Sequence, residues 1–290
     1  AMGAVAVAAG AAAVKLGKEV IAAYADYEQL VGGVDTLFKD SSQQLQTYAA
    51  NAYKTAGLSA NDYMETVTGF SASLIQSLGG DTEKAVKYAD MAITDMSDNA
   101  NKMGTDMSSI QNAYQGFAKQ NYTMLDNLKL GYGGTKQEME RLLADAEKIS
   151  GVKYDISSYA DVVEAIHVMQ ESMDIAGTTA KEAEATISGS VNALKSAVSN
   201  LIVGFGDADA DMELLCNNMV DAFKTVVANI TPVIENIVAA LPTALDALLT
   251  AVGELLPTLL EAVTELFSQV LETLLSLLPQ LIPAAVSALM

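Results

Sequence analysis

Histidine, cysteine and tryptophan are nearly absent from this sequence of 290 residues, which holds one histidine, one cysteine and no tryptophan. A single cysteine excludes a disulfide within the chain, and one Cys with one His excludes zinc sites built from several such ligands. Basic residues are also scarce, because 16 lysines and arginines stand against 36 acids, a formal net charge of −20. Affinity for a phosphate backbone depends on Lys and Arg, so this charge argues against specific nucleic-acid binding.

Proline and aromatic residues are scarce too. No proline precedes Pro232, and aromatic residues make up 6% of the chain, while 51% of it is hydrophobic and rich in Ala, Leu and Met. Such a composition favours helices over strands. No stretch alternates apolar and polar residues over the length of a strand. We therefore predict an all-α fold, an elongated array of helices that ends in an apolar helical region and is oligomeric.

Helical spacing of apolar residues, as at Tyr63, Val67 and Phe70, supports this class. It predicts helices near residues 14–31, 35–56, 60–78, 82–103, 106–130, 136–149, 159–175 and 180–204. Glycines mark the expected breaks, which are Gly32–Gly33, Gly57, Gly79–Gly80, Gly104, Gly133–Gly134, Gly151 and Gly177. A Ser or Thr followed three residues later by an acid predicts a capped helix start at Ser59/Asp62, Thr135/Glu138, Ser158/Asp161 and Thr179/Glu182.

The chain divides by composition into four parts. Residues 1–31 form an apolar, Ala-rich helix, 32–204 a helical core region, 205–212 a junction of Gly and Asp, and 213–290 an apolar amphipathic tail. The N-terminal run differs from a secretory signal, because its basic residues Lys15 and Lys18 follow the apolar stretch. Both ends fall in apolar helical sequence without capping residues, so we expect a segment of a longer polypeptide.

The tail repeats every 11 residues. Three apolar sets share that spacing: Phe223, Ile234, Leu245, Leu256, Phe267 and Leu278; Val226, Ile237, Leu248, Leu259, Val270 and Leu281; Ile230, Leu241, Val252, Val263 and Leu274. Eleven residues make three turns at about 3.67 per turn, so each set stays on one face of a helix. Acids fill the gaps, and Pro257 and Pro279, on the polar side, should kink or break the helix. Residues 273–290 form an uncharged run of 18 residues, which reaches the lower end of the length that a membrane-spanning helix needs.

Three groups of residues imitate ligand sites without matching them. Residues 131–136 (GYGGTK) lack the pattern of a phosphate loop, so we interpret them as a helix end followed by a helix start. Asp207, Asp209 and Asp211 open like a calcium loop, but Met212 and Asn218 stand where that loop needs Gly and Glu. We interpret a third group, Asp95, Asp98 and Asp106, as a solvated helix end.

No catalytic, cofactor-binding or metal-binding residue is nominated, and we expect no enzyme. His167 has no acid or nucleophile at a diagnostic spacing, which favours a partly buried structural histidine. Cys216 lies on the apolar stripe of the tail between Leu215 and Met219, as a small hydrophobic residue would. The 13 methionines are interpreted as packing residues.

Six segments in a fixed order carry a family resemblance. They are residues 27–38 (YEQLVGGVDTLF), 52–64 (AYKTAGLSANDYM), 95–104 (DMSDNANKMG), 114–135 (YQGFAKQNYTMLDNLKLGYGGT), 176–183 (AGTTAKEA) and 186–190 (TISGS). From residue 24 to about 206 the chain resembles the tail tape-measure proteins of tailed bacteriophages, particularly phages and prophages of Gram-positive bacteria. Unlike some members, it shows no long N-terminal coiled coil and no peptidoglycan-cleaving domain.

The resemblance implies a structural role in the virion. Family members lie as several copies in the lumen of the tail tube, set tail length during assembly, and leave the tube ahead of the DNA. It also implies partners, namely copies of the chain, tail tube and distal tail or baseplate proteins, assembly chaperones and, through residues 220–290, the host membrane. Alternative hypotheses are a membrane-active pore-forming protein and the tape measure of a phage-derived bacteriocin or injection device. A lytic enzyme is the weakest alternative.

Overall fold

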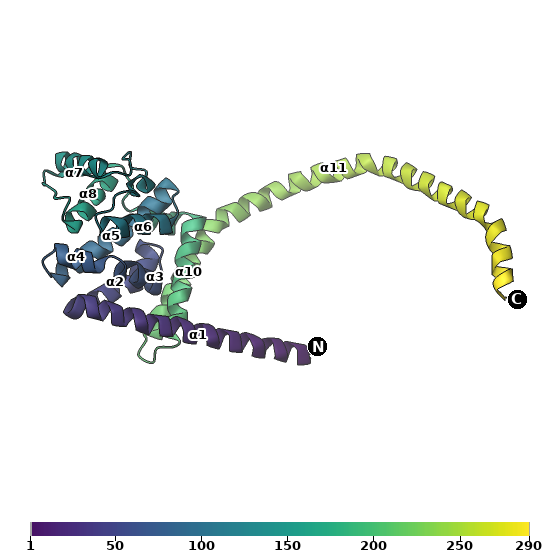
Figure 1. Ribbon diagram of the computed structural model, residues 1–290. Helices are drawn as coiled ribbons and strands as arrows, with labels where there is room; N and C mark the ends of the chain where they lie inside the picture. Colours follow the sequence, from purple (N-terminus) through teal and green to yellow (C-terminus); the bar gives the residue numbers. More distant parts are fainter. Residues whose placement is uncertain (1, 290) are drawn as a thin grey trace. The chain divides into compact units, whose positions relative to one another are not determined.

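The computed structural model describes residues 2–289, and describes side chains at 15–243, 245–257, 260, 261, 263 and 265. Every regular element among residues 2–289 is a helix, and no strand occurs within that range, so the predicted all-α class is confirmed (Figure 1). The chain forms two units, residues 1–230 and residues 231–290.

Among the described residues, the first unit contains every helix before the last one and also the start of that last helix. Its α-helices are α1 (Met2–Phe38), α2 (Ser42–Thr55), α3 (Ala60–Thr68), α4 (Ser71–Ser77), α5 (Thr82–Met103), α6 (Met107–Phe117), α7 (Lys136–Ser150), α8 (Tyr159–Ser172), α9 (Thr178–Ala185) and α10 (Ile187–Gly204). Two short 3-10 helices are η1 (Lys39–Ser41) and η2 (Leu125–Leu128). The last helix, α11 (Met212–Leu289), begins in this unit and continues through the second.

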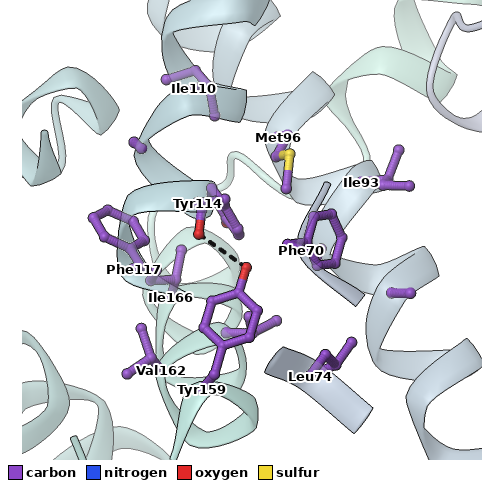
Figure 2. Close-up of a cluster of buried hydrophobic side chains, with 14 of the residues drawn as sticks. Phe70, Leu74, Ile93, Met96, Ile110, Tyr114, Phe117, Tyr159, Val162 and Ile166 are labelled. Atoms are coloured by element: carbon purple, nitrogen blue, oxygen red, sulfur yellow. Dashed lines mark hydrogen bonds between the residues drawn. The ribbon is translucent and has the colours of Figure 1, made fainter. Parts of the chain in front are cut away.

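Helix α5 is the centre of the first unit, because it packs against α1, α2, α3, α4, α6, α8 and α9. Its side chains Ile93 and Met96 are fully buried in one continuous apolar core. Figure 2 shows aromatic rings from α6 and α8 beside them, and the Tyr159 hydroxyl donates to the backbone oxygen of Tyr114 at 3.1 Å. The packing of α5 against α8 in this core also positions polar side chains of the two helices close to each other.

Three of the four predicted helix starts are confirmed. Ser59, Thr135 and Ser158 are the N-caps of α3, α7 and α8, and each side-chain oxygen accepts the backbone N–H three residues on. The fourth prediction, a cap at Thr179, is wrong because α9 already begins at Thr178. There the residue before the helix is Gly177, whose φ of +78° suits glycine.

The predicted break at Gly32–Gly33 is also wrong, because α1 runs through both glycines to Phe38. Continuing the helix brings Val34 and Phe38 into the core, where both are fully buried. That burial outweighs the cost of about 1 kcal/mol for each glycine inside a helix. The chain turns instead at Lys39, which has a φ of +50°.

Four predicted helices differ from the structure, because three of them are divided and one is shorter. The 35–56 prediction splits at η1, the 60–78 prediction splits at Gly69–Phe70, and the 180–204 prediction splits at Thr186. The 106–130 prediction ends at Phe117, and η2 follows it. Thr186 divides its segment because it ends α9 and caps α10, its hydroxyl oxygen accepting the Gly189 N–H at 2.9 Å.

Helix α11 is continuous through Pro257, so a break there is not observed. Beyond Ile230 the helix is bowed (Figure 1). A proline inside a helix removes one hydrogen bond and bends the axis, which is compatible with an unbroken course. The helix also continues through Pro279, so a break there is not observed either. The side chains of the uncharged run 273–290 lie outside the described residues.

Candidate functional site

In the first unit a histidine is held between two carboxylates. His167 of α8 places Nδ1 at 2.9 and 3.0 Å from the two carboxylate oxygens of Asp95 on α5. Its Nε2 lies 3.4 Å from Glu171 Oε1, one turn further along α8. The side chain of His167 is 27% exposed and that of Asp95 only 2%. His167 is therefore partly buried, as its sequence predicted.

Burial and pairing shift both groups toward holding a proton. Desolvation raises the pKa of Asp95 to about 6, although the hydrogen bond and charge of His167 oppose that rise. The pKa of His167 is raised, mainly by the hydrogen bond to Asp95, against the opposing effect of its own burial. The charge of Asp98, one turn along α5, raises the Asp95 pKa further. Each group therefore holds its proton to a higher pH than the same side chain would in water.

This pair lacks the partner that catalysis would need. Both ring nitrogens of His167 face carboxylates, and among the described residues no hydrogen bond joins the ring to a Ser, Thr or Cys side chain. A histidine activates a nucleophile only when the nucleophile lies within hydrogen-bond reach. The arrangement is suited to joining α5 and α8 and to storing a proton.

Asp98 joins α5 to the start of α9. Its carboxylate accepts the backbone N–H of Gly177 at 2.5 Å and of Thr179 at 2.7 Å, and the side chain is fully buried. The interpretation of Asp95 and Asp98 as a solvated helix end is therefore wrong. A buried carboxylate needs donors, and the first N–H groups of α9 supply them. Only Asp106, the exposed N-cap of α6, matches that interpretation.

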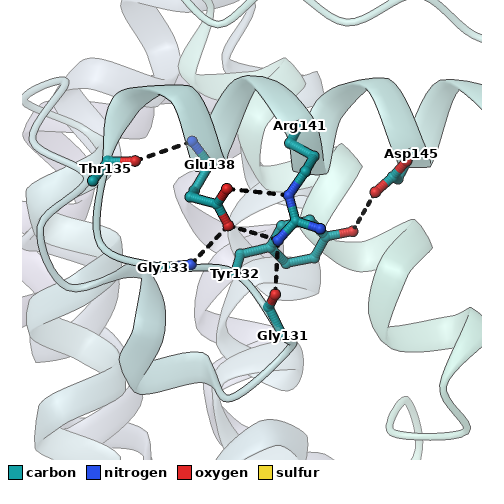
Figure 3. A network of polar contacts seen from close by, with 7 residues as sticks. All are labelled: Gly131, Tyr132, Gly133, Thr135, Glu138, Arg141 and Asp145. Carbon is teal, nitrogen blue, oxygen red and sulfur yellow. Dashed lines mark hydrogen bonds and ion pairs between the residues drawn. The ribbon is translucent and has the colours of Figure 1, made fainter.

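The loop at residues 131–136 is closed by side chains of α7, the helix that follows it (Figure 3). The Glu138 carboxylate accepts the Gly133 N–H at 3.0 Å and pairs with Arg141 at 2.6 Å, while Thr135 caps α7. The hydrogen bonds from Arg141 and Gly133 lower the pKa of Glu138. The Glu138 carboxylate already occupies the Gly133 N–H group, which a bound phosphate would need. The interpretation of these residues as the start of a helix is therefore favoured over a phosphate loop.

The junction between α10 and α11 uses its acids locally. Asp207 accepts the backbone N–H of Asp209 at 3.0 Å, and Asp211 accepts that of Leu214 at 2.9 Å at the start of α11. These are turn and capping bonds. Among the described residues, no group of three or more His, Cys, Asp or Glu side chains is arranged to hold a metal ion.

The largest apolar surface lies on α11. Met212–Pro257 is long and apolar enough to cross a membrane by length and composition, and its described residues beyond Ile230 are exposed. Beyond Ile230, the exposed large hydrophobic side chains are Val233, Ile234, Ile237, Val238, Leu241, Leu245, Leu248, Leu249, Val252, Leu255, Leu256, Leu260 and Val263. We call the helical surface that these residues form the apolar face. Burying one Leu, Ile or Val fully is worth about 1.5–3 kcal/mol, so covering this face would be strongly favourable.

The start of α11 is anchored in the first unit. Ala222 and Val226 are buried there, and Ala222 packs with Tyr53 and Ala197. Cys216 on the same segment is exposed, so it does not pack as the small hydrophobic residue that its sequence position indicated.

Sequence reasoning missed the pairing of Asp95 with His167 because the two residues are 72 positions apart. It also missed the Asp98 cap, since the polar run around it resembles a solvated helix end. No protein family, curated protein or solved structure matches the chain.

Proposed function

We propose that this chain is a structural component of a phage tail, a tape-measure protein that sets tail length during assembly and leaves at infection to help genome delivery. The observation that carries the proposal is the long apolar face of α11, left exposed in an all-α chain. Such a surface requires a partner along its length. The resemblance of residues 24–206 to tape-measure proteins supplies the setting in which that partner would be found.

The proposed partners and location follow from that setting. Copies of the chain, the tail tube, distal tail or baseplate proteins and assembly chaperones would surround it in the tube lumen. At infection it would reach the tail tip and the host envelope, where residues 220–290 would meet the membrane. The net charge of −20 suits a protein that must make way for DNA without binding it.

A structural role also accounts for the polar groups of the first unit. The His167, Asp95 and Asp98 contacts join helices, and Glu138 with Arg141 closes a loop. Each group has a packing or capping partner, so we assign none of them a role in catalysis. We therefore propose a protein without enzymatic activity.

A second candidate is a membrane-active pore-forming protein. The specific observation in its favour is the apolar stretch Met212–Pro257, which is long enough to cross a bilayer and is exposed beyond Ile230. The tape measure of a phage-derived bacteriocin or injection device is a third candidate, and it would retain the same assembly role without a genome to deliver.

Tail length measured by electron microscopy tests the leading proposal. In the phage or prophage that encodes the chain, removing residues 242–263 deletes two 11-residue repeats and keeps the face continuous. If the segment is helical in the tail, tails should shorten by about 33 Å, at 1.5 Å per residue. Duplicating the same residues is the matched control and should lengthen tails equally. Unchanged tail length, or absence of the chain from purified particles, would exclude the tape-measure role.

A further inference from the structure

The 11-residue repeat of the tail continues upstream, through the junction and into α10. Carried back from Phe223, Val226 and Ile230, the three sets continue with Leu201 and Met212; Ala193, Gly204 and Leu215; Ala197, Ala208 and Met219. Each of these positions holds an apolar residue or glycine, and the junction acids Asp207, Asp209 and Asp211 occupy other positions. The passage from α10 to α11 therefore keeps the register that one unbroken helix would have.

In the structure a turn at residues 205–211 interrupts this register, and the start of α11 folds back beside α10 (Figure 1). Ala222 of α11 packs with Ala197 of α10. Further along α11, the side-chain amide of Asn229 donates to the backbone oxygen of Glu184 at 3.2 Å and of Thr186 at 3.0 Å. We call α10, the turn and residues 212–230 the hairpin.

The turn is held by local hydrogen bonds. The Asp207 N–H donates to the backbone oxygen of Gly204 at 3.2 Å, and the Ala210 N–H donates to that of Asp207 at 3.3 Å. The Asp207 carboxylate accepts the Asp209 N–H at 3.0 Å, which leaves Ala208 at the second position of a β-turn. A continuous helix would give each of these backbone groups a partner four residues away, so opening the turn leaves none of them unpaired.

The start of α11 is docked over a small area. Between residues 212 and 230 the side chains of Ala222 and Val226 are buried, whereas the larger Leu214 and Phe223 are exposed. Tyr53, which packs with Ala222, has its hydroxyl buried with no hydrogen-bond partner among the described residues. A buried polar group without a partner weakens the contact that buries it. The folded-back position of α11 is therefore held by few favourable contacts.

Two glycines permit the close approaches of the hairpin. A Cβ atom at Gly204 would collide with the side chain of Leu215, and one at Gly206 would lie 2.5 Å from Cβ of Tyr24 on α1. Glycine is also among the poorest residues inside a helix, and alanine is the best. Alanine at these two positions would thus crowd the hairpin and favour a continuous helix at the same time.

We propose that the turn at residues 205–211 is a hinge, at which α10 and α11 join into one helix when the hairpin opens. The joined helix would run from Ile187 to Leu289 and be about 155 Å long, at 1.5 Å per residue. Its three apolar sets would then follow one surface from α10 onward. The hinge is a property of the single chain in solution and does not rest on the proposed function.

The distance between two spin labels, measured by double electron–electron resonance on the full chain, tests the hinge. The labels are attached through Ser188→Cys and Ala228→Cys, two exposed positions, in a chain that also carries Cys216→Ser. In the hairpin the labels should lie within about 20 Å, two helix diameters, because Asn229 is hydrogen-bonded to Thr186. In the joined helix, 40 residues separate them and the distance should be about 60 Å. The labelled chain without further changes should give the short distance as its main peak.

Variants of the turn should move this distance in opposite directions. Gly204→Ala together with Gly206→Ala should shift the main peak to about 60 Å. Ala208→Pro, added to those two changes, should lower the 60 Å fraction several-fold, because proline suits the second position of a β-turn and destabilises a helix interior. Gly32→Ala is the matched control, since an added Cβ there meets nothing within 4 Å in α1, and it should leave the short distance unchanged.

Asp207→Ala opens the turn without adding bulk, because it removes the acceptor of the Asp209 N–H and introduces a better helix former. It should give a distinct peak near 60 Å while thermal unfolding of the first unit stays close to that of the parent chain. If the two glycine substitutions unfold that unit, Asp207→Ala decides the outcome. Either of two results would overturn the hinge: the short distance alone in every variant that folds, or a broad distribution without a 60 Å peak, which would mean that the turn opens into irregular chain.

Discussion

At the scale of single residues, the chain's only histidine lies between a buried and an exposed carboxylate. Asp95 is hidden from water and hydrogen-bonded to His167, so each partner alters the protonation of the other. Both pKa values are raised, that of Asp95 to about 6. The folded chain therefore binds protons at this pair more tightly than the unfolded chain does.

We predict that this pair makes the first unit less stable as pH rises. The Asp95 contribution is complete below about pH 4 and is lost as pH rises through about 6. The His167 contribution is complete below about pH 6.5 and is lost above it, through the raised folded pKa. Between pH 5 and 8 the loss of the Asp95 contribution should lower the free energy of unfolding by about 1–2 kcal/mol, and the loss of the His167 contribution should lower it further. Urea unfolding followed by circular dichroism at several pH values measures this change.

Asp95→Asn is the variant that isolates the effect, because the amide keeps the shape of the side chain and removes its charge. Its unfolding free energy should vary less with pH over the same range. Asp126→Asn is the matched control, since Asp126 is exposed in η2, and it should follow the wild-type curve. Parallel pH profiles for wild type and Asp95→Asn would contradict the assignment.

A second residue-scale prediction concerns Gln120, which is exposed and has a φ of +57°. A left-handed conformation costs an L-residue about 1–2 kcal/mol, while glycine adopts it freely. Gln120→Gly should therefore stabilise the fold by about 0.5–1 kcal/mol after the added freedom of the unfolded chain is included. Gln43→Gly, in the right-handed backbone of α2, should destabilise it. Thermal unfolding of both variants measures the contrast, and destabilisation by Gln120→Gly would refute the argument.

At the scale of elements, helix starts depend on caps that come from two sources. Asp106 caps its own helix from the surface, whereas Asp98 reaches from the last two turns of α5 to cap α9. The second kind connects two elements that are far apart in the sequence. Loss of the Asp98 carboxylate would leave the N–H groups of Gly177 and Thr179 without their acceptor.

We predict that Asp98→Ala destabilises the first unit by about 2–5 kcal/mol, because one buried and one partly buried N–H group lose a charged acceptor. Asp106→Ala removes an exposed cap and should cost only about 1 kcal/mol. Urea unfolding of the two variants compares the same substitution in two settings. Equal losses would show that the Asp98 contacts add nothing beyond ordinary capping.

This distinction explains how much of the fold was predictable from sequence. Ser59, Thr135 and Ser158 were identified because a local cap is written in neighbouring residues. The start of α9 was not, because its acceptor comes from Asp98, about 80 positions earlier. The break expected at Gly32–Gly33 failed for a related reason, since distant core contacts keep α1 helical there.

The candidate site was predictable only in part, for the same physical reason. The apolar face of α11 follows from periodicity, which is a local pattern. The Asp95–His167 pair depends on the crossing of α5 and α8, and no spacing in the sequence encodes that crossing.

At the scale of the whole molecule, charge sets the choice of ligands. With 36 acids against 16 bases, the chain should repel a polyanion at every salt concentration. We predict no shift of a DNA duplex in a gel titration at about 150 mM salt, and none at lower salt, where a basic binder would gain affinity. A complex that weakens as salt is added would contradict this prediction and reveal a basic surface that the net charge conceals.

The anchoring of the first turns of α11 in the first unit has a consequence for how the rest of that helix forms. Starting a helix is unfavourable, because several residues must be ordered for the first hydrogen bond, whereas each further residue adds one bond. Ala222 and Val226 hold residues 212–230 helical by burial. The chain beyond Ile230 therefore needs only to elongate a helix that is already nucleated. Folding of the first unit thus templates the segment that carries the apolar face.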